Sequence, residues 1–296
     1  MKEKKDIRSL TIEELTSFFK SNNMPSYRAN QVYNWLWKKS CLSFDEMTNI
    51  SLELRNLLKS KFVINHIKID KLQKSKDGTI KNAISLYDNL LVESVLIPTK
   101  SRTTACISSQ VGCSLDCDFC ATSKMDRIRN LNPDEIYDQA VTINSQSLKY
   151  HDRPISNIVF MGMGEPLLNY SNVIKGIDKI TSKEGLGMSP KRITVSTSGI
   201  SKLIIKMADD NVKFNLAISL HSAIEKTRNK IMPFSKKFPL EDLLEAVKYW
   251  NLKTNKIVTY EYIVWEGIND DDEHINALVK FCKSSPSKVN LIEYNT

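Results

Sequence analysis

The feature that most constrains the fold is an alternation of strand-like and helix-like segments that begins at Thr103. Short apolar runs rich in β-branched residues alternate with segments of helical period, the first opening at Asn132-Pro133 with an N-cap residue and a proline at N1. The expected strands are Thr104–Ser108, Asn157–Met161, Arg192–Thr197, Phe214–Leu220, Lys256–Val264 and Val289–Tyr294. Further helices are expected at about 171–182, 200–209, 239–250 and 271–283. This alternation predicts an α/β fold with parallel strands, either a (β/α)6 partial barrel or an open doubly wound sheet.

The first hundred residues have a different pattern. Helices are expected from the capping box Thr11-Ile-Glu-Glu14 to about Asn22, from Tyr27 to Lys39, and from Ser51 onward. A period of two then runs over Phe62–Ile69, and strands are expected at Lys81–Leu86 and Leu90–Ile97. We therefore divide the chain into a helical accessory domain (1–65), a connecting β-meander (66–102) and the main domain (103–296).

Charge and hydropathy narrow the classes of function. The net charge is +8, and residues 1–80 hold 15 Lys and Arg against 9 Asp and Glu. A basic front end favours a polyanionic partner such as RNA, although a lysine-rich composition without a partner fits the charge equally well. The sequence has neither an 18-residue apolar run nor a signal peptide, so we expect a cytoplasmic protein without membrane contact. Clustered cysteines in that compartment indicate a metal or redox site and not structural disulfides.

Three of the six cysteines lie within eight residues, in Cys113-Ser-Leu-Asp-Cys117-Asp-Phe-Cys120. This C-x3-C-x2-C spacing supplies three thiolates, one fewer than a structural zinc site or a ferredoxin cluster needs. A [4Fe–4S] cluster bound here would keep one iron available to an outside ligand, and the spacing resembles that of radical S-adenosylmethionine (SAM) enzymes. The alternative is a zinc knuckle with a distant fourth ligand such as Cys106.

Polar motifs follow the next three expected strands, where the carboxyl ends of parallel strands gather ligand sites. Met161-Gly-Met-Gly-Glu165-Pro166 combines paired glycines, which let the backbone approach a ligand, with a carboxylate that suits the ammonium group of SAM. Val195–Gly199 and Ser219-Leu-His221 offer hydroxyl and imidazole groups for its carboxylate and ribose. Taken singly, these motifs also fit a common βα turn, a strand-end cap and a hydrogen-bonded turn histidine.

Together these motifs resemble the RlmN family, the dual-specificity radical SAM methyltransferases that act on C2 of an adenosine in 23S rRNA and tRNA. The matching segments are Glu93–Pro98, Cys106–Cys113, the cysteine loop through Leu131, Gly162–Asn169, Ile193–Gly199, Ala217–His221 and Asn290–Asn295. The helical front end also matches the accessory domain of the family. The resemblance implies a radical SAM (β/α)6 partial barrel with a small N-terminal helical accessory domain, one [4Fe–4S] cluster and SAM.

The resemblance also implies a role for each matching position. Cys113, Cys117 and Cys120 correspond to the cluster ligands. The implied SAM-site residues are Gly164, Glu165, Ser196, Ser219, Leu220, His221 and Asn295. Glu93 corresponds to the proton acceptor, and Cys106 to the cysteine that resolves a protein–RNA adduct and leaves a disulfide.

The implied chemistry explains why such residues are needed. Adenine C2 is an electron-poor carbon without a lone pair, so it cannot displace the methyl group of SAM directly. The family first methylates a cysteine, then uses a 5′-deoxyadenosyl radical to form a carbon radical that adds to C2, and a base accepts the C2 proton. The target base must leave its stack to react. A flavodoxin-type reductant and a monomeric state are also expected.

The end of the chain departs from the family pattern. The sequence stops at Tyr294-Asn295-Thr296, before the tail that carries the methyl-accepting cysteine, and Cys282 does not match that position. We therefore expect a fragment that binds the cluster and SAM but does not methylate RNA. The nearest alternative activity is Cfr-type methylation of adenosine C8, which shares these motifs. A non-catalytic zinc- and RNA-binding module and a glycyl-radical activase are further alternatives, and the activase has no use for Cys106 or Glu93.

Overall fold

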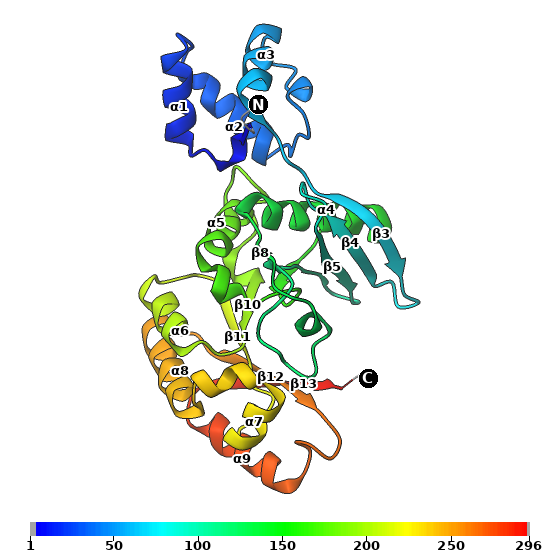
Figure 1. Cartoon of the computed structure of the whole chain (residues 1–296), viewed down its shortest axis with the longest axis vertical. Helices are drawn as coiled ribbons and strands as arrows, with labels where there is room; N and C mark the ends of the chain where they lie inside the picture. The colour runs from blue at the N-terminus through cyan, green and yellow to red at the C-terminus, as the bar shows by residue number, and fades with distance from the viewer. Residues whose placement is uncertain (1–3, 295–296) are drawn as a thin grey trace.

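The structure is a computed structural model that describes residues 4–294. Its largest element is a nine-stranded sheet with the order β13-β12-β11-β10-β9-β6-β5-β4-β3 (Figure 1). The strands are β3 (Lys68–Lys74), β4 (Ile80–Ser85), β5 (Leu91–Pro98), β6 (Thr103–Cys106), β9 (Asn157–Phe160), β10 (Ile193–Thr197), β11 (Asn215–Ser219), β12 (Val258–Val264) and β13 (Ser287–Glu293). All six strands expected after residue 103 are confirmed, each to within two residues at either end.

The strand order distinguishes the two α/β folds that the sequence left open. Strands β6, β9, β10, β11, β12 and β13 pair in parallel and follow one another in chain order. A doubly wound sheet reverses its strand order at a switch point, and this part of the sheet has no reversal. Because crossovers are right-handed, a sequential order places the helices on one side of the sheet and leaves the other side concave. The fold is therefore the expected partial barrel, extended at its first edge by the antiparallel strands β5, β4 and β3.

The crossover helices follow from local signals in the sequence. They are α4 (Pro133–His151), α5 (Tyr170–Thr181), α6 (Ser201–Asp209), α7 (Glu225–Ile231), α8 (Leu240–Thr254) and α9 (Asp272–Lys283). Helix α4 begins as expected, because Asn132 and Glu135 form a capping box with Pro133 between them. Helix α7 was not expected, since its seven residues are too few to show a helical period.

The front end forms three helices, α1 (Ile12–Ser21), α2 (Tyr27–Trp37) and α3 (Leu52–Lys61). The predicted capping box is present, with reciprocal hydrogen bonds between Thr11 and Glu14. The continuous strand expected over Phe62–Ile69 is wrong. Its first two residues form β2 (Phe62–Val63), which pairs with β1 (Lys5–Asp6), and its last two belong to β3. Residues 64–67 between them are not in a strand, and the backbone N–H of Asn65 donates to the Asp6 carboxylate instead.

A buried ionic contact joins the front end to helix α4. The guanidinium of Arg8, 8% exposed, donates to both carboxylate oxygens of Asp138 at 2.8 and 2.9 Å and to Asp134 at 3.1 Å. Beside it, the Tyr137 hydroxyl donates to the carbonyl of Trp37 at 2.6 Å. One hydrophobic core runs from the front helices into the barrel, so the two parts pack as one body. Among the described residues, no helix has the length and apolar character to span a membrane.

Candidate active site

A cavity of about 250 Å³ lies on the concave side of the sheet, where the strands β9 to β12 end. The cysteine loop forms one wall, and Cys113, Cys117 and Cys120 all line the cavity. The opposite wall consists of strand-end side chains and the turn after β9. The lining residues that the sequence predicted are Gly164, Glu165, Ser196, Ser219 and His221. The structure therefore brings most of the predicted site into one hollow.

The backbone of the cysteine loop is held at both ends. The short strands β7 (Gln110–Val111) and β8 (Arg129–Asn130) pair antiparallel and close the loop. Gly112 has φ +75°, and a Cβ there would lie 2.0 Å from the carbonyl oxygen of Asp126, so only glycine fits before Cys113. Within the loop, the Ser123 hydroxyl lies 2.6 Å from the carbonyl oxygens of both Cys117 and Cys120. The turn that carries the last two cysteines is thus fixed by a side chain of the loop itself.

Burial affects the ionisation of two of the three loop thiols. Burial raises the pKa of Cys117 to about 12 and raises that of Cys113, so these thiols need a cationic ligand in order to ionise. Cys106 does not line the cavity with the three loop cysteines, so the structure gives no support for a zinc knuckle in which Cys106 is the fourth ligand.

Glu165 is the buried carboxylate of the cavity, at 3% exposure. Its two oxygens accept hydrogen bonds from the backbone N–H groups of Leu167 at 3.0 Å and Ser198 at 2.7 Å. Its own N–H donates to the side chain of Gln110 at 2.8 Å. Desolvation raises the pKa of this carboxyl despite the two hydrogen bonds. A ligand that brings positive charge into the cavity would relieve that cost.

The paired glycines are required for packing within the protein, and not for the close approach of a ligand that the sequence suggested. A Cβ on Gly162 would lie 2.6 Å from the Ser108 hydroxyl, and one on Gly164, at φ +91°, would lie 2.4 Å from the Cβ of Gln110. These glycines therefore let the turn after β9 pack against the segment after β6. The close packing holds Glu165 over the cavity.

The end of β11 presents His221 in a left-handed conformation, with φ 53°. Its Nδ1 accepts the backbone N–H of Ile263 at 3.1 Å, and its ring meets Phe119 of the cysteine loop edge-to-face at 4.4 Å. Burial lowers its pKa to about 3, so the imidazole is neutral with its proton on Nε2. The side chain of Leu220 does not line the cavity, although its backbone N–H donates to the carbonyl of Glu261.

Several residues of the site were not predicted. Glu261 on β12 lines the cavity and accepts a 2.6 Å hydrogen bond from Asn290 on β13, while Gln110 supports Glu165. Arg228 of α7 is fully buried behind the strand ends. Only Glu261 gave a signal in the sequence, as a single charged residue within an apolar strand. Gln110 and Arg228 lie among other polar residues, and their partners Glu165 and Ser198 are 55 and 30 residues away.

Cys106 and Glu93 lie outside the cavity but on the same face of the sheet. Val95 pairs with Cys106 across β5 and β6, and Glu93 is two residues from Val95, so the three side chains share one face. Cys106 is 8% exposed, and burial raises its pKa to about 11. The carboxylate of Glu93 is half exposed and forms a 2.7 Å ion pair with Lys81.

Two expectations from the resemblance, a contact of Asn295 with SAM and a disulfide, have no counterpart in the described residues. Asn295, predicted to contact SAM, lies beyond the described residues. All six cysteines are within residues 4–294, and each is a free thiol, so the disulfide implied by the resemblance is not present.

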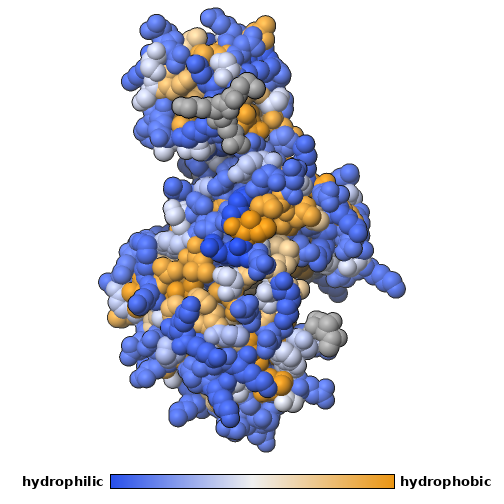
Figure 2. Space-filling view, in the orientation of Figure 1, coloured by the Kyte–Doolittle hydropathy of each residue, from blue (hydrophilic) through white to orange (hydrophobic). Residues whose placement is uncertain are grey.

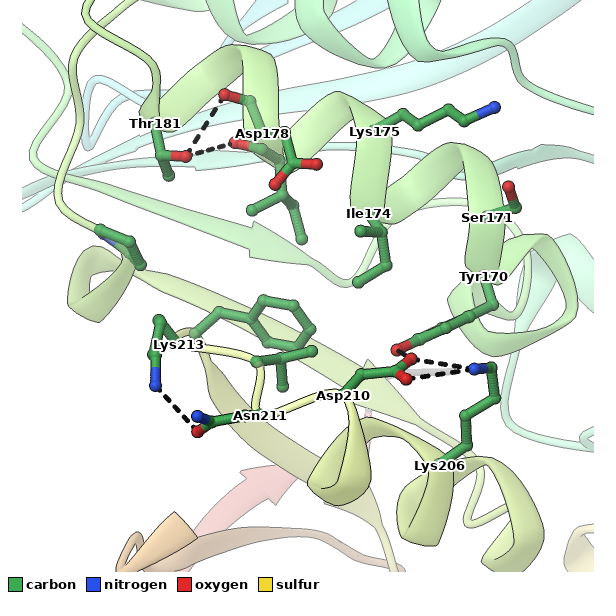
Figure 3. Close-up of a pocket in the computed structure, with 14 residues that line it drawn as sticks. Tyr170, Ser171, Ile174, Lys175, Asp178, Thr181, Lys206, Asp210, Asn211 and Lys213 are labelled. Atoms are coloured by element: carbon green, nitrogen blue, oxygen red, sulfur yellow. Dashed lines mark hydrogen bonds and ion pairs between the residues drawn. The ribbon is translucent and has the colours of Figure 1, made fainter.

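A second, larger cavity of about 590 Å³ lies on the outside of the barrel, between α5 and α6 (Figures 2 and 3). Its floor is apolar, and at its rim Asp210 accepts hydrogen bonds from the Tyr170 hydroxyl and the Lys206 ammonium (Figure 3). None of the predicted site residues lines it. The strand-end cavity is therefore the candidate active site.

Comparison with known proteins agrees with this geometry. Residues 5–64 match the ribosomal RNA large subunit methyltransferase N-terminal domain, and residues 107–279 match the radical SAM superfamily. A probable dual-specificity RNA methyltransferase RlmN from Flavobacterium johnsoniae is 66% identical over 99% of this chain and 84% of its own length. The chain belongs to the RlmN family of radical SAM methyltransferases.

A more distant RlmN relative and a solved structure support the same family membership. The dual-specificity RNA methyltransferase RlmN of Nitratidesulfovibrio vulgaris is 43% identical over 98% of this chain and 82% of its own length. The crystal structure of a radical SAM methyltransferase from Sphaerobacter thermophilus has a TM-score of 0.92 and 32% identity, covering 99% of this chain and 86% of that one. Membership of the RlmN family does not favour the Cfr-type alternative. It brings with it the predicted cofactors, a [4Fe–4S] cluster and SAM.

Proposed function

We propose that this chain carries the cluster and SAM sites of an RlmN-type enzyme that methylates C2 of adenosine in 23S rRNA and in tRNA. The observation that carries the proposal is the strand-end cavity, in which three cysteines of the radical SAM motif face a buried carboxylate. The relatives named RlmN extend over almost the whole chain, which supports the same substrate class.

In this proposal Cys113, Cys117 and Cys120 hold the cluster, and the open side of the cavity receives SAM. When bound, the two groups together supply the radical chemistry that an unactivated carbon requires. The protein contributes a cavity in which the cysteine loop and the strand ends exclude water from that chemistry.

The remaining SAM contacts follow from charge and hydrogen-bonding capacity. We assign Glu165, with Gly164 beside it, to the ammonium group, because a buried carboxylate is stabilised by a cation. His221 has its Nδ1 occupied, so its Nε2–H is free to donate to an oxygen of the ligand. Ser196 and Ser219 line the same wall and supply hydroxyl groups. We assign Leu220 a contact with SAM through its backbone. The contact of Asn295 with SAM, which the resemblance implies, is also part of the proposal.

Glu93 and Cys106 are assigned to the RNA side of the reaction. Both lie on the concave face, where an unstacked adenine can reach the cavity. The Glu93 carboxylate accepts the C2 proton, for which it must leave Lys81. Cys106 resolves the covalent adduct as a thiolate. Its raised pKa means that a base must take the thiol proton as it attacks.

The front end is proposed to position the RNA. Residues 1–80 carry most of the excess positive charge, which suits a phosphate backbone. We retain the division into an RNA-binding accessory domain (1–65), a connecting meander (66–102) and a catalytic barrel (103–296) on this basis. A flavodoxin-type reductant, a monomeric state and a cytoplasmic location complete the proposal.

Two assays test this function. Anaerobic reconstitution followed by dithionite and SAM should yield 5′-deoxyadenosine, and C113A should abolish it while leaving the fold intact by circular dichroism. The complete gene, expressed in a host without its own C2 methyltransferase, should then produce 2-methyladenosine in both RNAs by mass spectrometry. Detection of 8-methyladenosine instead, or of unmodified RNA alongside a folded, cluster-loaded protein, would contradict the proposal.

A further inference from the structure

Arg228 is a buried cation without a carboxylate partner. It lies in the middle of α7, and its side chain is 0% exposed. Among the residues that the structure describes, no Asp or Glu lies within ion-pair distance of its guanidinium, in contrast to Arg8, which is paired with Asp138 and Asp134. Burying an unpaired guanidinium lowers the stability of the folded protein. We therefore ask which function of the site would require a buried positive charge.

The groups that Arg228 contacts are neutral backbone carbonyls and a methionine sulfur. Its guanidinium donates to the carbonyl of Ser198 after β10 at 2.6 Å and to those of Ser219 at 2.8 Å and Leu220 at the end of β11. One nitrogen also lies 3.4 Å from the sulfur of Met232. These bonds tie two strand ends together, but carbonyl groups do not neutralise the charge, and the Nε atom has no partner.

The charge lies next to the cysteine loop. Met232 and Ile231, which follow Arg228 in and after α7, pack with Leu115 and Cys117 in a small apolar cluster. The backbone N–H of Asp118 donates to the carbonyl of Ile231 at 3.0 Å, so the loop is attached to the end of α7. Met232, whose sulfur lies 3.4 Å from the guanidinium, therefore separates Arg228 from Cys117, and both residues are buried away from solvent screening.

The other titratable groups around Arg228 weaken the effect of its charge but do not pair with the guanidinium. Glu225, one turn earlier on α7, keeps its negative charge while its carboxylate accepts the N–H of Leu240, and it forms no ion pair with Arg228 among the described residues. His221 is neutral, as described above, and the positive charge of Arg228 contributes to keeping it so. Glu165 lies on the far wall of the cavity and acts on the cysteines with the opposite sign.

We propose that Arg228 supplies a fixed positive charge that stabilises the reduced cluster and thereby raises its reduction potential. Reduction adds one electron, and hence one negative charge, to a group already ligated by thiolates. A cation held in a low-dielectric surrounding therefore stabilises the reduced form more than the oxidised form. In this role Arg228 acts on the cluster through its charge alone and contacts neither SAM nor RNA. The inference rests on the proposed cluster site.

The test compares two substitutions in the cluster-loaded protein. R228Q keeps N–H donors for the strand-end carbonyls but removes the charge, whereas R228K keeps a charge but loses the forked donors. The measurement is a redox titration with dithionite and mediator dyes, followed by electron paramagnetic resonance. At the same applied potential, the ratio of reduced to oxidised cluster in R228Q should be at least tenfold lower than in the wild type. That shift corresponds to a potential lower by about 59 mV. R228K at pH 6 should remain within threefold of the wild type.

A matched control is R8M, which removes another buried arginine, at the front-end interface, and should leave the potential unchanged. Equal potentials in R228Q and the wild type, or equal decreases in R228Q and R228K at pH 6, would overturn the inference. If R228Q fails to retain its cluster, R228K is titrated from pH 6 to 9. Burial lowers the pKa of a lysine, so its potential should fall with pH more steeply than that of the wild type. Equal slopes would overturn the inference. Absence of a cluster in the wild-type protein would contradict the proposed function instead.

Discussion

The backbone N–H of Ile263 on β12 donates to the Nδ1 of His221 at 3.1 Å and so sets the tautomer of that imidazole. Because the ring is also buried, its pKa is lowered to about 3 from the ordinary value near 6.5. The unfolded chain therefore binds a proton that the folded protein excludes, and stability falls as the pH drops from 6.5 toward 3. This relationship connects a site residue to the acid sensitivity of the fold.

We expect H221N to weaken that acid sensitivity. Asparagine tolerates the left-handed backbone at this position and can accept the Ile263 N–H. The wild type should lose about 2 kcal/mol of unfolding free energy between pH 7 and 5 from this histidine, and H221N should lose correspondingly less. Urea denaturation at both pH values measures the difference. Identical pH dependences would show that His221 is not the group responsible.

Substitution of Gly164 should be far more damaging than substitution of Gly187. Both glycines have positive φ, so alanine strains the backbone in each case, but only at Gly164 would the new Cβ meet another residue, 2.4 Å from the Cβ of Gln110. We expect G164A to cost about 3 kcal/mol of stability or more and G187A about 1 kcal/mol. Chemical denaturation measures both values. Equal costs would mean that the turn after β9 can move away from Gln110.

E165Q should reduce SAM affinity at least tenfold, equivalent to about 1.4 kcal/mol. The substitution removes the buried charge and directs an amide N–H toward the N–H of either Leu167 or Ser198. The pKa of Glu165 is raised, so SAM binding by the wild type should weaken as acidification protonates this carboxyl. Calorimetry of the cluster-loaded proteins between pH 5 and 8 tests this prediction. The binding of E165Q should vary less with pH, and tight binding by E165Q would exclude Glu165 as the ammonium partner.

R8M should destabilise the protein by about 3–5 kcal/mol, because it leaves Asp138 and Asp134 buried without their cation. The exposed pair of Lys59 and Asp45 provides the comparison, and D45N should cost less than about 1 kcal/mol. Thermal unfolding followed by circular dichroism measures both. A small effect of R8M would show that the front end contributes little to the stability of the barrel.

S123A should speed the loss of iron to a chelator several-fold. The hydroxyl holds the carbonyls of Cys117 and Cys120 at 2.6 Å, and losing one such bond costs about 1 kcal/mol. Ser145 on α4 provides the control, since its hydroxyl also donates to a carbonyl, that of Val141, but far along the chain from the cysteines. If S145A and S123A release iron at the same rate, the contact does not secure the loop.

The sequence predicted the barrel well because each parallel strand is a short run of β-branched and apolar residues, as in Ile193–Thr197. The strand over Phe62–Ile69 was mispredicted for a tertiary reason, since Asp6 takes up the backbone N–H of Asn65. Periodicity contains no information about such a partner.

The same distinction applies to the site. The cysteine loop and Glu165 belong to compact motifs, so their spacing alone was informative. Glu261 contacts Asn290, which strand pairing brings opposite it, and Gln110 contacts the turn after β9. Arg228 contacts backbone carbonyls at the ends of two strands. Their roles depend on three-dimensional distances that no local pattern records.

The sequential strand order has a consequence for how the protein can change. Along β12, Tyr260 packs against Phe281 of α9 on the convex side, whereas the adjacent Glu261 lines the cavity on the concave side. Neighbouring codons therefore encode separate properties, one the attachment of a helix and the next the composition of the site. A lineage can alter what the concave side accepts, one alternate residue at a time, while the contacts that keep each helix in place remain intact.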